Sequence, residues 1–457
     1  MIGQSDVKQK IGVDLLLSSE MATAIDRWAS MYINQASWLD EKNGVRSLGL
    51  PAAIAQEIAR MITIEMKVEV TGGGRATWLQ TQYDMFSHKL PEFIEYGCAL
   101  GSLIMKPYVS NGQIAVDFVQ SDQFYPVNFD TSGNITAVVF ADQKVIGEMY
   151  YTRLEYHRQV DNTIEVINRA FRSSTKDTLG SAIDLGIVEE WASLAPEVTF
   201  SNVSQPLYGY FRYPLANHVD RNSPLGVSCY SRADQLIEDT DRQYGRYKWE
   251  FEGGELALHV DDVAAMGLGT DGLPMLPNKR LYRKLPGAST IGEGELFHAW
   301  APQLRDESYE RGLQAMKREI EFECGLAYGT ISNPQMIEKT ATEIANAKQR
   351  SQSTITNGQK ALRLALDQLF YAMDAYATIY SLAQPGAYTV TQGYDDSLIT
   401  DKDTQRMQDR QDVTLGVMPK YRYLMDTRGM TEAEAMKWIA EAQNEQPQDF
   451  FQNEQGA

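Results

Sequence analysis

The sequence has 457 residues, which is long for one compact core and predicts two or more structural modules. Hydrophobic residues make up 43% of the chain, an ordinary share for a globular protein. With 61 acidic and 42 basic residues the net charge is −19, which disfavours free diffusion onto nucleic acid or an anionic membrane. Any contact with DNA is therefore expected to be local and weak.

The chain carries no pattern of export or membrane insertion. Its start, "MIGQSDVKQKIGVDLLLSSEM", lacks a basic region followed by an apolar run, and no uncharged apolar stretch reaches the length of about 18 residues that a membrane helix needs. Cys98, Cys229 and Cys324 are odd in number and far apart, which argues against a disulfide framework or a zinc cluster. We expect a soluble, unexported protein.

The first hundred residues favour helices, because apolar residues recur there at helical spacing. The expected helices are 21–34, 51–66, 76–88 and 90–97.

From Gly101 the apolar period changes to two, and five strand-like segments follow. Turn residues separate them at Asn111-Gly112, at 132–134 and at Asp161-Asn162. In "GEMYYTRLEYHRQV" apolar and charged residues alternate, which predicts an antiparallel sheet with one face in solvent. The segment 173–202 is mixed and predicts no single element.

Two charged helices are predicted on either side of a small insertion. The first runs from Ser228 to Glu252 and ends at Gly253-Gly254. The residues up to Leu304 are rich in glycine and proline with short strand-like segments, as in a β-rich insertion. Helix resumes at Arg305 and continues through "ESYERGLQAMKREIEFECGLAY".

A long helix is predicted next. Thr340 and Glu343 have the spacing of a capping box, so the helix is expected from Thr340 to Leu382, about 60 Å at ~1.5 Å per residue. Gly358 is the expected kink. Only the half after Gly358 carries an apolar stripe, formed by Leu362, Leu366, Leu369, Met373, Tyr376 and Tyr380. A strand near Tyr388 and two or three short helices from Asp401 complete the chain.

Motifs of catalysis are weak in this sequence. "GLGTDG" precedes two prolines that oppose the helix a dinucleotide loop requires, and Gly72-Gly73-Gly74 lacks the lysine and hydroxyl of a phosphate loop. The five histidines show no metal-ligand spacing, and no nucleophile-elbow or zinc-protease motif occurs. We expect a protein that is not an enzyme and holds no cofactor.

Several segments together resemble the portal proteins of tailed bacteriophages, of the siphophage type. "NSPLGVSCYSRADQLIEDTD" is similar to the family's Ser-Pro-Leu-Gly-x-Ser turn and aspartate-rich helix, and "CGLAYGTIS" with "KTATEIANAKQRSQSTI" resembles its Gly-Leu and Thr-Ala-Thr-Glu motifs. "YDDSLITDKDTQRMQDRQDVTLGVMPKYRYLM" resembles its closing segment. The resemblance spans about residues 22–445 and implies an α+β, mainly helical portal fold with wing, stem, clip and crown regions.

The resemblance also implies a division of the chain. The implied regions are an N-terminal arm and α/β wing at 1–205, a wing-to-stem segment and first stem helix at 206–252, a β-rich clip at 253–304, a second stem helix at 305–327, a tunnel loop at 328–339, a long kinked helix at 340–384, a wing strand at 385–400, and a helical crown and tail at 401–457.

In that family the subunits form a ring, commonly a dodecamer, at one vertex of the capsid, through which double-stranded DNA is packaged and ejected. The resemblance therefore implies a structural protein of the virion, assembled in the host bacterial cytoplasm, with no membrane partner. The implied partners are other copies of the chain, terminase and then the head-tail adaptor, the major capsid and scaffolding proteins, and DNA that passes without sequence-specific binding. A metal-dependent nucleic-acid enzyme and another head-completion protein are the alternatives.

Three sets of residues are assigned to these contacts. The tunnel-loop set, which would face DNA, is Thr330, Ser332, Asn333, Gln335 and Lys339. The stem set is Asp234, Glu238, Asp241, Arg242, Arg246, Lys317 and Arg318. The clip set, a docking surface, is Lys279, Arg280, Arg283 and Lys284. A second interpretation of the tunnel-loop set is that its members only cap the next helix.

Overall fold

The computed structural model describes residues 2–255, 257–260, 282–284, 297–334, 341–394 and 402–444. The chain divides into two units, Met1–Gly393 and Tyr394–Ala457. The first unit contains both helices and antiparallel sheets, so it is a mixed α and β structure. Within the described residues, no helix is both long enough and apolar enough to cross a membrane.

Five helices lie in the first hundred residues. They are α1 (Gln4–Ile11), α2 (Ser19–Tyr32), α3 (Leu50–Thr63), α4 (Gly74–Ser87) and α5 (Leu90–Leu100). The four predicted helices are confirmed with ends shifted by a few residues. The sequence did not predict α1, because Val7 is its one buried residue and gives no apolar period.

Two antiparallel sheets follow α5 in the chain. One has the order β10-β2-β3, from Gly209–Arg212, Ser102–Ser110 and Gln113–Gln120. The other has the order β4-β5-β6-β7-β8, with β9 also paired to β7. Its strands are β4 (Phe124–Phe129), β5 (Ile135–Ile146), β6 (Met149–Val160), β7 (Thr163–Ser173), β8 (Ser181–Ile183) and β9 (Glu197–Ser201).

The predicted hairpin turns are confirmed. Asn111 and Asp161 have φ of 50° and 53°, the left-handed conformation that short hairpin loops require and that Asn and Asp tolerate. The unassigned segment 173–202 contains β8, β9 and two short 3₁₀ turns. It showed no period because each of its elements is very short.

The prediction of a half-solvated sheet is wrong for β6. Glu155 and His157, expected to face solvent, are buried together with Tyr156 on the opposite face. The side chain of Lys106 from β2 lies 2.8 Å from the Glu155 carboxylate. An opposite charge from a second sheet thus permits charged residues on a buried face.

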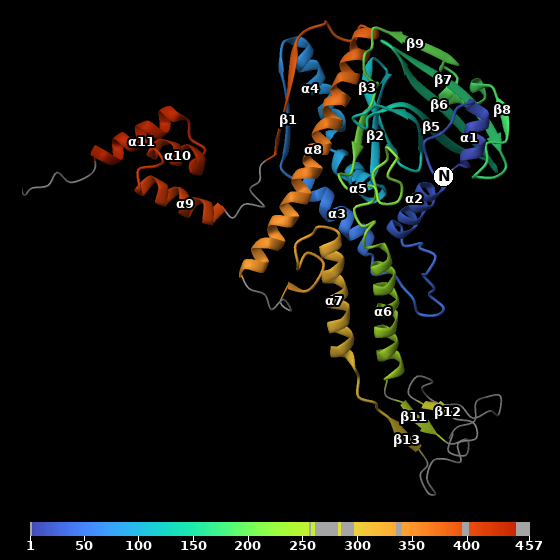
Figure 1. Ribbon diagram of the computed structural model, residues 1–457, viewed down its shortest axis with the longest axis vertical. Helices are drawn as coiled ribbons and strands as arrows, with labels where there is room; N and C mark the ends of the chain where they lie inside the picture. The colour runs from blue at the N-terminus through green and yellow to red at the C-terminus, as the bar shows by residue number, and fades with distance from the viewer. Residues whose placement is uncertain are drawn as a thin grey trace, which may run out of the picture. The chain divides into compact units, whose positions relative to one another are not determined.

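Two helices project side by side from the first unit: α6 (Asp234–Gly253) and α7 (Asp306–Glu323) (Figure 1). Between them in the chain lie β11 (Ala257–Val260), β12 (Tyr282–Lys284) and β13 (Phe297–Trp300), a three-stranded sheet of order β12-β11-β13. The predicted order of helix, β-rich insertion and helix is confirmed. The first helix begins at Asp234 rather than Ser228, because residues 228–233 form hydrogen-bonded turns.

Helix α8 (Ala341–Ile379) has 39 residues and packs on β10 and β2. Its apolar stripe is buried as predicted at Leu362, Leu366, Leu369, Met373 and Tyr376. Tyr380 is 49% exposed, because α8 ends one residue before it. The strand that follows, β14 (Tyr388–Tyr394), pairs with β1 (Met66–Gly72).

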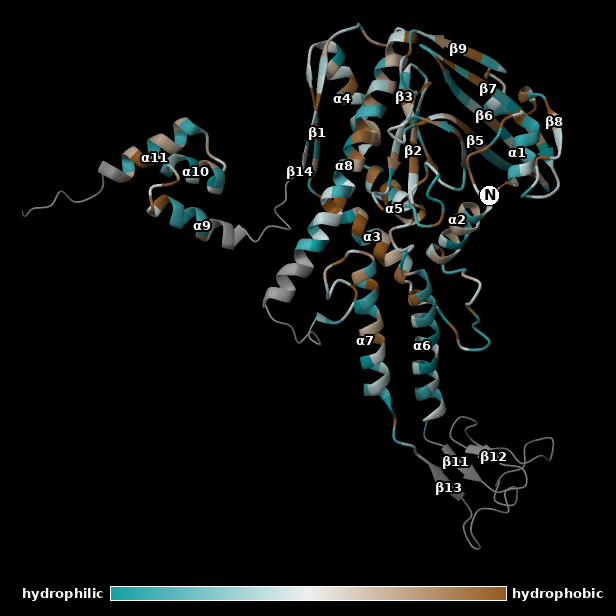
Figure 2. Ribbon diagram, viewed as in Figure 1, coloured by the Kyte–Doolittle hydropathy of each residue, from teal (hydrophilic) through white to brown (hydrophobic). Residues whose placement is uncertain are grey.

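Hydrophobic residues of the first unit form one large buried cluster that joins α2, α3, α5, β2 and α8. Trp28 of α2 and Phe370 of α8 are among its largest members. Figure 2 shows the contrast between this apolar body and the mostly polar or weakly hydrophobic residues of α6 and α7. The large apolar side chains that the projecting helices bury are Ile237 on α6 and Leu313 and Ile320 on α7, so these helices bury little apolar surface of their own.

The second unit consists of α9 (Lys402–Thr414), α10 (Lys420–Arg428) and α11 (Glu432–Asn444), as the sequence predicted. Thr431 caps α11 through a capping box, with its hydroxyl 2.8 Å from the Glu434 carboxylate. Among the residues of this unit whose burial is described, only Ala435 is buried. The described residues of this unit therefore bury little apolar surface.

Gly358 permits a close approach of α8 to α3. Helix α8 is continuous through this position, and the kink stays a prediction. A Cβ atom added at Gly358 would lie 2.4 Å from the Cδ1 atom of Ile62, which is fully buried. Packing against α3 is thus a reason for glycine that is independent of any bend.

We predict that Gly358→Ala lowers the free energy of unfolding by about 1 kcal/mol, because overpacking outweighs the ~1 kcal/mol that alanine gains in helix propensity. Gly312→Ala in α7 is the matched control, since its new Cβ would contact nothing within 4 Å and should be neutral or stabilising. Denaturant unfolding measures both. An Ile62→Val background should reduce the loss at position 358; an unchanged loss would contradict the proposed contact.

Candidate functional site

The projecting helix pair is clamped at its far end by one ion pair. Arg305 donates from Nε and Nη2 to the two carboxylate oxygens of Glu250, at 3.0 and 2.6 Å, and its backbone N–H donates at 3.1 Å. These hydrogen bonds lower the pKa of Glu250. The rings of Tyr247 and Tyr309 lie 6.3 Å apart one turn nearer the body. These two contacts define the register in which the antiparallel helices α6 and α7 pack.

At its near end α6 is held by a buried carboxylate. Asp241 accepts hydrogen bonds from Trp38 Nε1 at 3.0 Å and from the Leu48 backbone N–H at 2.9 Å. Burial raises the pKa of Asp241, while both hydrogen bonds oppose that rise. Asp241 was expected on the stem surface; it is instead an internal anchor for the loop between α2 and α3, which contains Trp38 and Leu48.

The other stem residues remain at least partly accessible. Arg27 of α2 lies 3.1 Å from Asp234 and 3.4 Å from Glu238, and Arg242 pairs with Glu238 at 2.8 Å. Arg246 is exposed, and Lys317 and Arg318 are half-buried on α7. The stem residues of α6 near the body thus form ion pairs with Arg27 of α2 or with one another.

A second buried carboxylate shapes the chain after α7. Glu321 is fully buried and accepts hydrogen bonds from the backbone N–H groups of Gly329, Ile331 and Ser332 at 3.1, 2.7 and 2.9 Å. The Ser332 hydroxyl donates to the same carboxylate at 2.9 Å. Gly325 and Gly329 take φ of 70° and 89°, which the tight path requires. Residues 325–332 therefore form a fixed turn.

This turn corrects one member of the tunnel-loop set. Ser332 is 5% exposed, and its hydroxyl is committed to Glu321, so its assignment as a DNA-facing residue is wrong. Thr330 is exposed, and its hydroxyl donates to the Ala327 carbonyl. Asn333 is half-buried, and its backbone N–H donates to Gln314 at 2.7 Å.

Several predicted positions fall where no side chain is described. Gln335, Lys339 and Thr340 lie outside the described residues, as do Lys279 and Arg280. Of the clip set, Arg283 and Lys284 are placed as backbone in β12, where they pair in parallel with His259 and Val260 of β11.

The polar first half of α8 meets the end of α7. The guanidinium of Arg350 lies 4.2 Å from the centre of the Phe322 ring, a cation–π contact. Ser351 and Ile355 are buried, and a Cβ atom at Gly325 would lie 2.4 Å from the Thr354 hydroxyl. The part of this half near residue 350 therefore packs against the turn after α7.

The sequence did not predict the buried charge cluster around Glu155. Its carboxylate lies 2.8 Å from Lys106 Nζ, 3.0 Å from Arg153 Nη1 and 2.6 Å from His157 Nε2. Burial by itself would raise the pKa of Glu155, but the three partners hold it well below its ordinary value. The cluster ties β2 to β6, and it lies apart from the helix pair in the chain.

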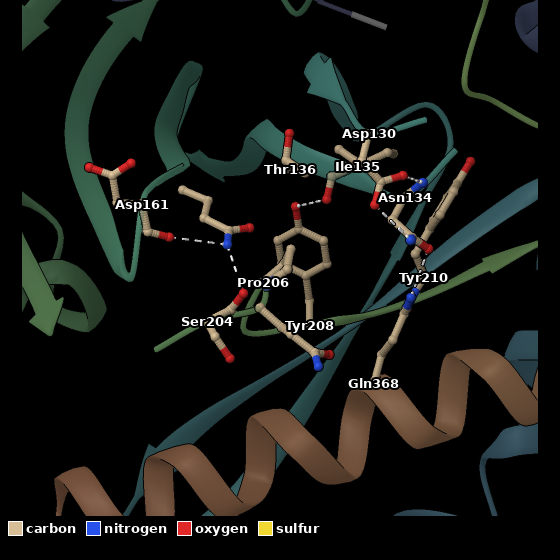
Figure 3. A pocket seen from close by; sticks show the side chains of 12 residues that line it. Asp130, Asn134, Ile135, Thr136, Asp161, Ser204, Pro206, Tyr208, Tyr210 and Gln368 are labelled. Atoms are coloured by element: carbon tan, nitrogen blue, oxygen red, sulfur yellow. Dashed lines mark hydrogen bonds between the residues drawn. The ribbon is translucent and has the colours of Figure 1, made fainter. Parts of the chain in front are cut away.

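A polar pocket of about 590 Å³ opens where α8 meets the turns of the sheets (Figure 3). Gln368 of α8 accepts a hydrogen bond from the Tyr210 backbone N–H at 2.9 Å and donates to Asn134 at 3.0 Å. The Tyr208 hydroxyl donates to the Ile135 carbonyl at 2.8 Å. These groups in the pocket wall hydrogen-bond to one another. The two hydrogen bonds of Gln368 join α8 to β10 and to the turn between β4 and β5.

The three cysteines are free and buried, and the fold brings them close together although the sequence separates them. The backbone N–H of Cys229 donates to the Cys98 carbonyl at 2.9 Å. Burial, followed by the nearby Cys98 and Cys324, raises the pKa of Cys229 well above its ordinary value. Such thiols are poor nucleophiles and serve as packing residues here.

We predict that Glu321→Gln loosens the turn after α7. Loss of the charge-assisted hydrogen bonds should cost about 2 kcal/mol of unfolding free energy and speed amide exchange at Gly329, Ile331 and Ser332. Hydrogen exchange at single-residue resolution measures this. Glu319→Gln, an exposed neighbour, is the control. Equal exchange in both variants would show that the Glu321 carboxylate does not hold the turn.

The Glu155 cluster predicts a pH dependence. The folded pKa of Glu155 is lowered, so its contribution to stability is complete above 4.5, its ordinary value, and is lost as the pH falls through the folded value. Glu155→Gln should cost about 3 kcal/mol at neutral pH, because Lys106 and Arg153 lose their shortest ion pairs and keep only Asp117 at 3.8 Å and Asp142 at 3.6 Å. Below pH 4.5 the variant should lose less stability than the native chain does.

Urea unfolding between pH 3 and pH 7 tests this expectation, with Glu148→Gln in the exposed β5–β6 turn as the control. Parallel pH curves for native chain and Glu155→Gln would contradict it.

In the part of the chain that the structure describes, no three His, Cys, Asp or Glu side chains are grouped so that they could hold a metal ion. No protein-family model matches the sequence, and no curated protein does. Among solved structures, a chain of "Neck of native GTA particle computed with C12 symmetry" aligns with a TM-score of 0.37 and 12% identity, covering 84% of this chain and 91% of that chain. A superposition at this TM-score does not establish a shared fold.

Proposed function

We propose that this chain is the subunit of a bacteriophage portal, a ring at one capsid vertex through which double-stranded DNA enters and leaves. The observation that carries the proposal is the projecting pair α6 and α7. It bears a β-rich insertion at its far end and leads through a fixed turn into the 39-residue helix α8. Of the motifs quoted for the portal resemblance, those at 222–241, 324–332 and 339–355 lie on or next to these elements, and the closing segment at 394–425 covers α9 and part of α10.

The proposed regions follow the element order. The sheets with α1–α5 and the β1–β14 pair form the wing, α6 and α7 the stem, residues 253–304 the clip, and α9–α11 the crown. The clip would dock terminase during packaging and the head-tail adaptor afterwards. The capsid and scaffolding proteins would surround the wing. Twelve copies are the expected number from the resemblance.

A ring explains two features that are unfavourable in a single chain. The stem helices bury little apolar surface, which is unstable for isolated helices but reasonable when neighbouring copies flank them. The second unit buries only Ala435 among its residues of described burial, and neighbouring crowns would supply the missing contacts.

The charge of the chain suits a channel through which DNA slides. Twelve copies would carry about −230 charges, so most of the wall would repel the phosphates and prevent tight binding. Thr330 and Asn333, which are polar and uncharged, remain candidates for brief contact with DNA. Gln335 and Lys339 remain sequence-based candidates.

Negative-stain microscopy of the purified full-length chain, under several assembly conditions, tests the proposal. We expect rings with a central hole and a solution mass of about twelve chains. A chain that stays monomeric under all conditions would overturn it. Metal-dependent cleavage of DNA by the purified monomer would favour the alternative of a nucleic-acid enzyme.

A further inference from the structure

The in-chain register of α6 and α7 assigns a level along the helix pair to every residue of both helices. Tyr247 and Tyr309 lie at the same level, since their rings are in contact and the helices are antiparallel. Toward the body the residue numbers fall along α6 and rise along α7. Asp239, eight residues before Tyr247, therefore lies at the level of Lys317, eight residues after Tyr309. In the same way Arg246, one residue before Tyr247, lies at the level of Glu310, one residue after Tyr309.

These four residues are complementary in charge and matched in spacing. Asp239 and Arg246 are seven residues apart on α6, and Glu310 and Lys317 are seven apart on α7. Seven residues make nearly two helical turns, so each pair shares one helix face about 10.5 Å apart. At the level nearer the body, the acid Asp239 on α6 matches the base Lys317 on α7. At the level next to the tyrosines, the base Arg246 on α6 matches the acid Glu310 on α7.

The complementarity is not used within the chain. Among the described residues, Asp239, Lys317 and Glu310 form no ion pair, and Arg246 makes only a 3.4 Å hydrogen bond to Gln243. Asp239 and Arg246 are exposed, on the same stripe as the 65% exposed Trp249. This stripe carries unpaired charge and a large apolar group, which together indicate a surface that another protein covers.

We propose that Asp239 and Arg246 of one copy pair with Lys317 and Glu310 of the adjacent copy in the ring. This inference rests on the proposed function, because it requires rotational symmetry about an axis along the helix pair. Such a rotation keeps every residue at its own level. The register that Tyr247 and Tyr309 set inside one chain is therefore repeated between α6 of one copy and α7 of the next.

Charge reversal tests this pairing and separates it from a contact within one chain. Asp239→Lys alone and Lys317→Asp alone each place like charges at every junction of the ring. Each should lower the affinity between adjacent copies by about five-fold or more. The loss of closed rings should be larger, because the contact repeats at every junction. An equal mixture of the two variants should restore rings of alternating chains, since each junction then joins opposite charges.

Native mass spectrometry of full-length chains, one carrying a mass tag, measures the outcome. Glu148→Lys, the same charge change on the β5–β6 turn, is the control and should assemble like the native chain. The pairing is confirmed if neither variant forms rings alone and the mixture forms rings that each contain the two variants in equal numbers. It is overturned if the single variants assemble normally, or if a chain that carries both substitutions forms rings while the mixture of single variants does not. Failure of the native chain to form rings would instead overturn the proposed function.

Discussion

The buried carboxylate of Glu321 determines the path of the chain directly after α7, from Gly325 to Ser332. A carboxylate inside a protein is stable only when its oxygens are hydrogen-bonded, and here three backbone N–H groups and the Ser332 hydroxyl supply those bonds. The same bonds satisfy donors of a turn that has little secondary structure of its own. One side chain thus holds residues 325–332 in a fixed path.

The helix pair depends on the same principle at its two other fixed points. Asp241 joins α6 to the loop between α2 and α3, and Glu250 joins the far end of α6 to Arg305. Neither helix has enough apolar surface to pack by the hydrophobic effect alone. Directed hydrogen bonds at the ends leave the outer faces free, and those faces carry the charges that we assign to a neighbouring copy.

Local patterns in the sequence were enough to predict most elements. Helical periodicity located α2–α5 and the second half of α8, and the Asn-Gly and Asp-Asn dipeptides located two hairpins, because both signals act over a few residues. The buried stripe of α8 from Leu362 to Tyr376 was predicted for the same reason.

The roles of Asp241 and Glu155 as anchors could not be predicted, since their partners are distant in sequence. Asp241 bonds to Leu48 across 193 positions, and the Glu155 cluster reaches Lys106 on another sheet. Without those partners each acid resembles an ordinary surface charge. Ser332 was misassigned for a different reason: its partner Glu321 is only 11 residues away, but the sequence does not show that the loop folds back onto the preceding helix.

In the ring that we propose, α6, α7 and the turn held by Glu321 surround a channel. A symmetric cryo-electron microscopy reconstruction of the assembled protein tests it most directly. We expect a ring in which the helix pairs run along the symmetry axis and the residues after Ser332 face the central opening. A ring in which those residues face outward, or in which the helix pairs lie away from the opening, would contradict it.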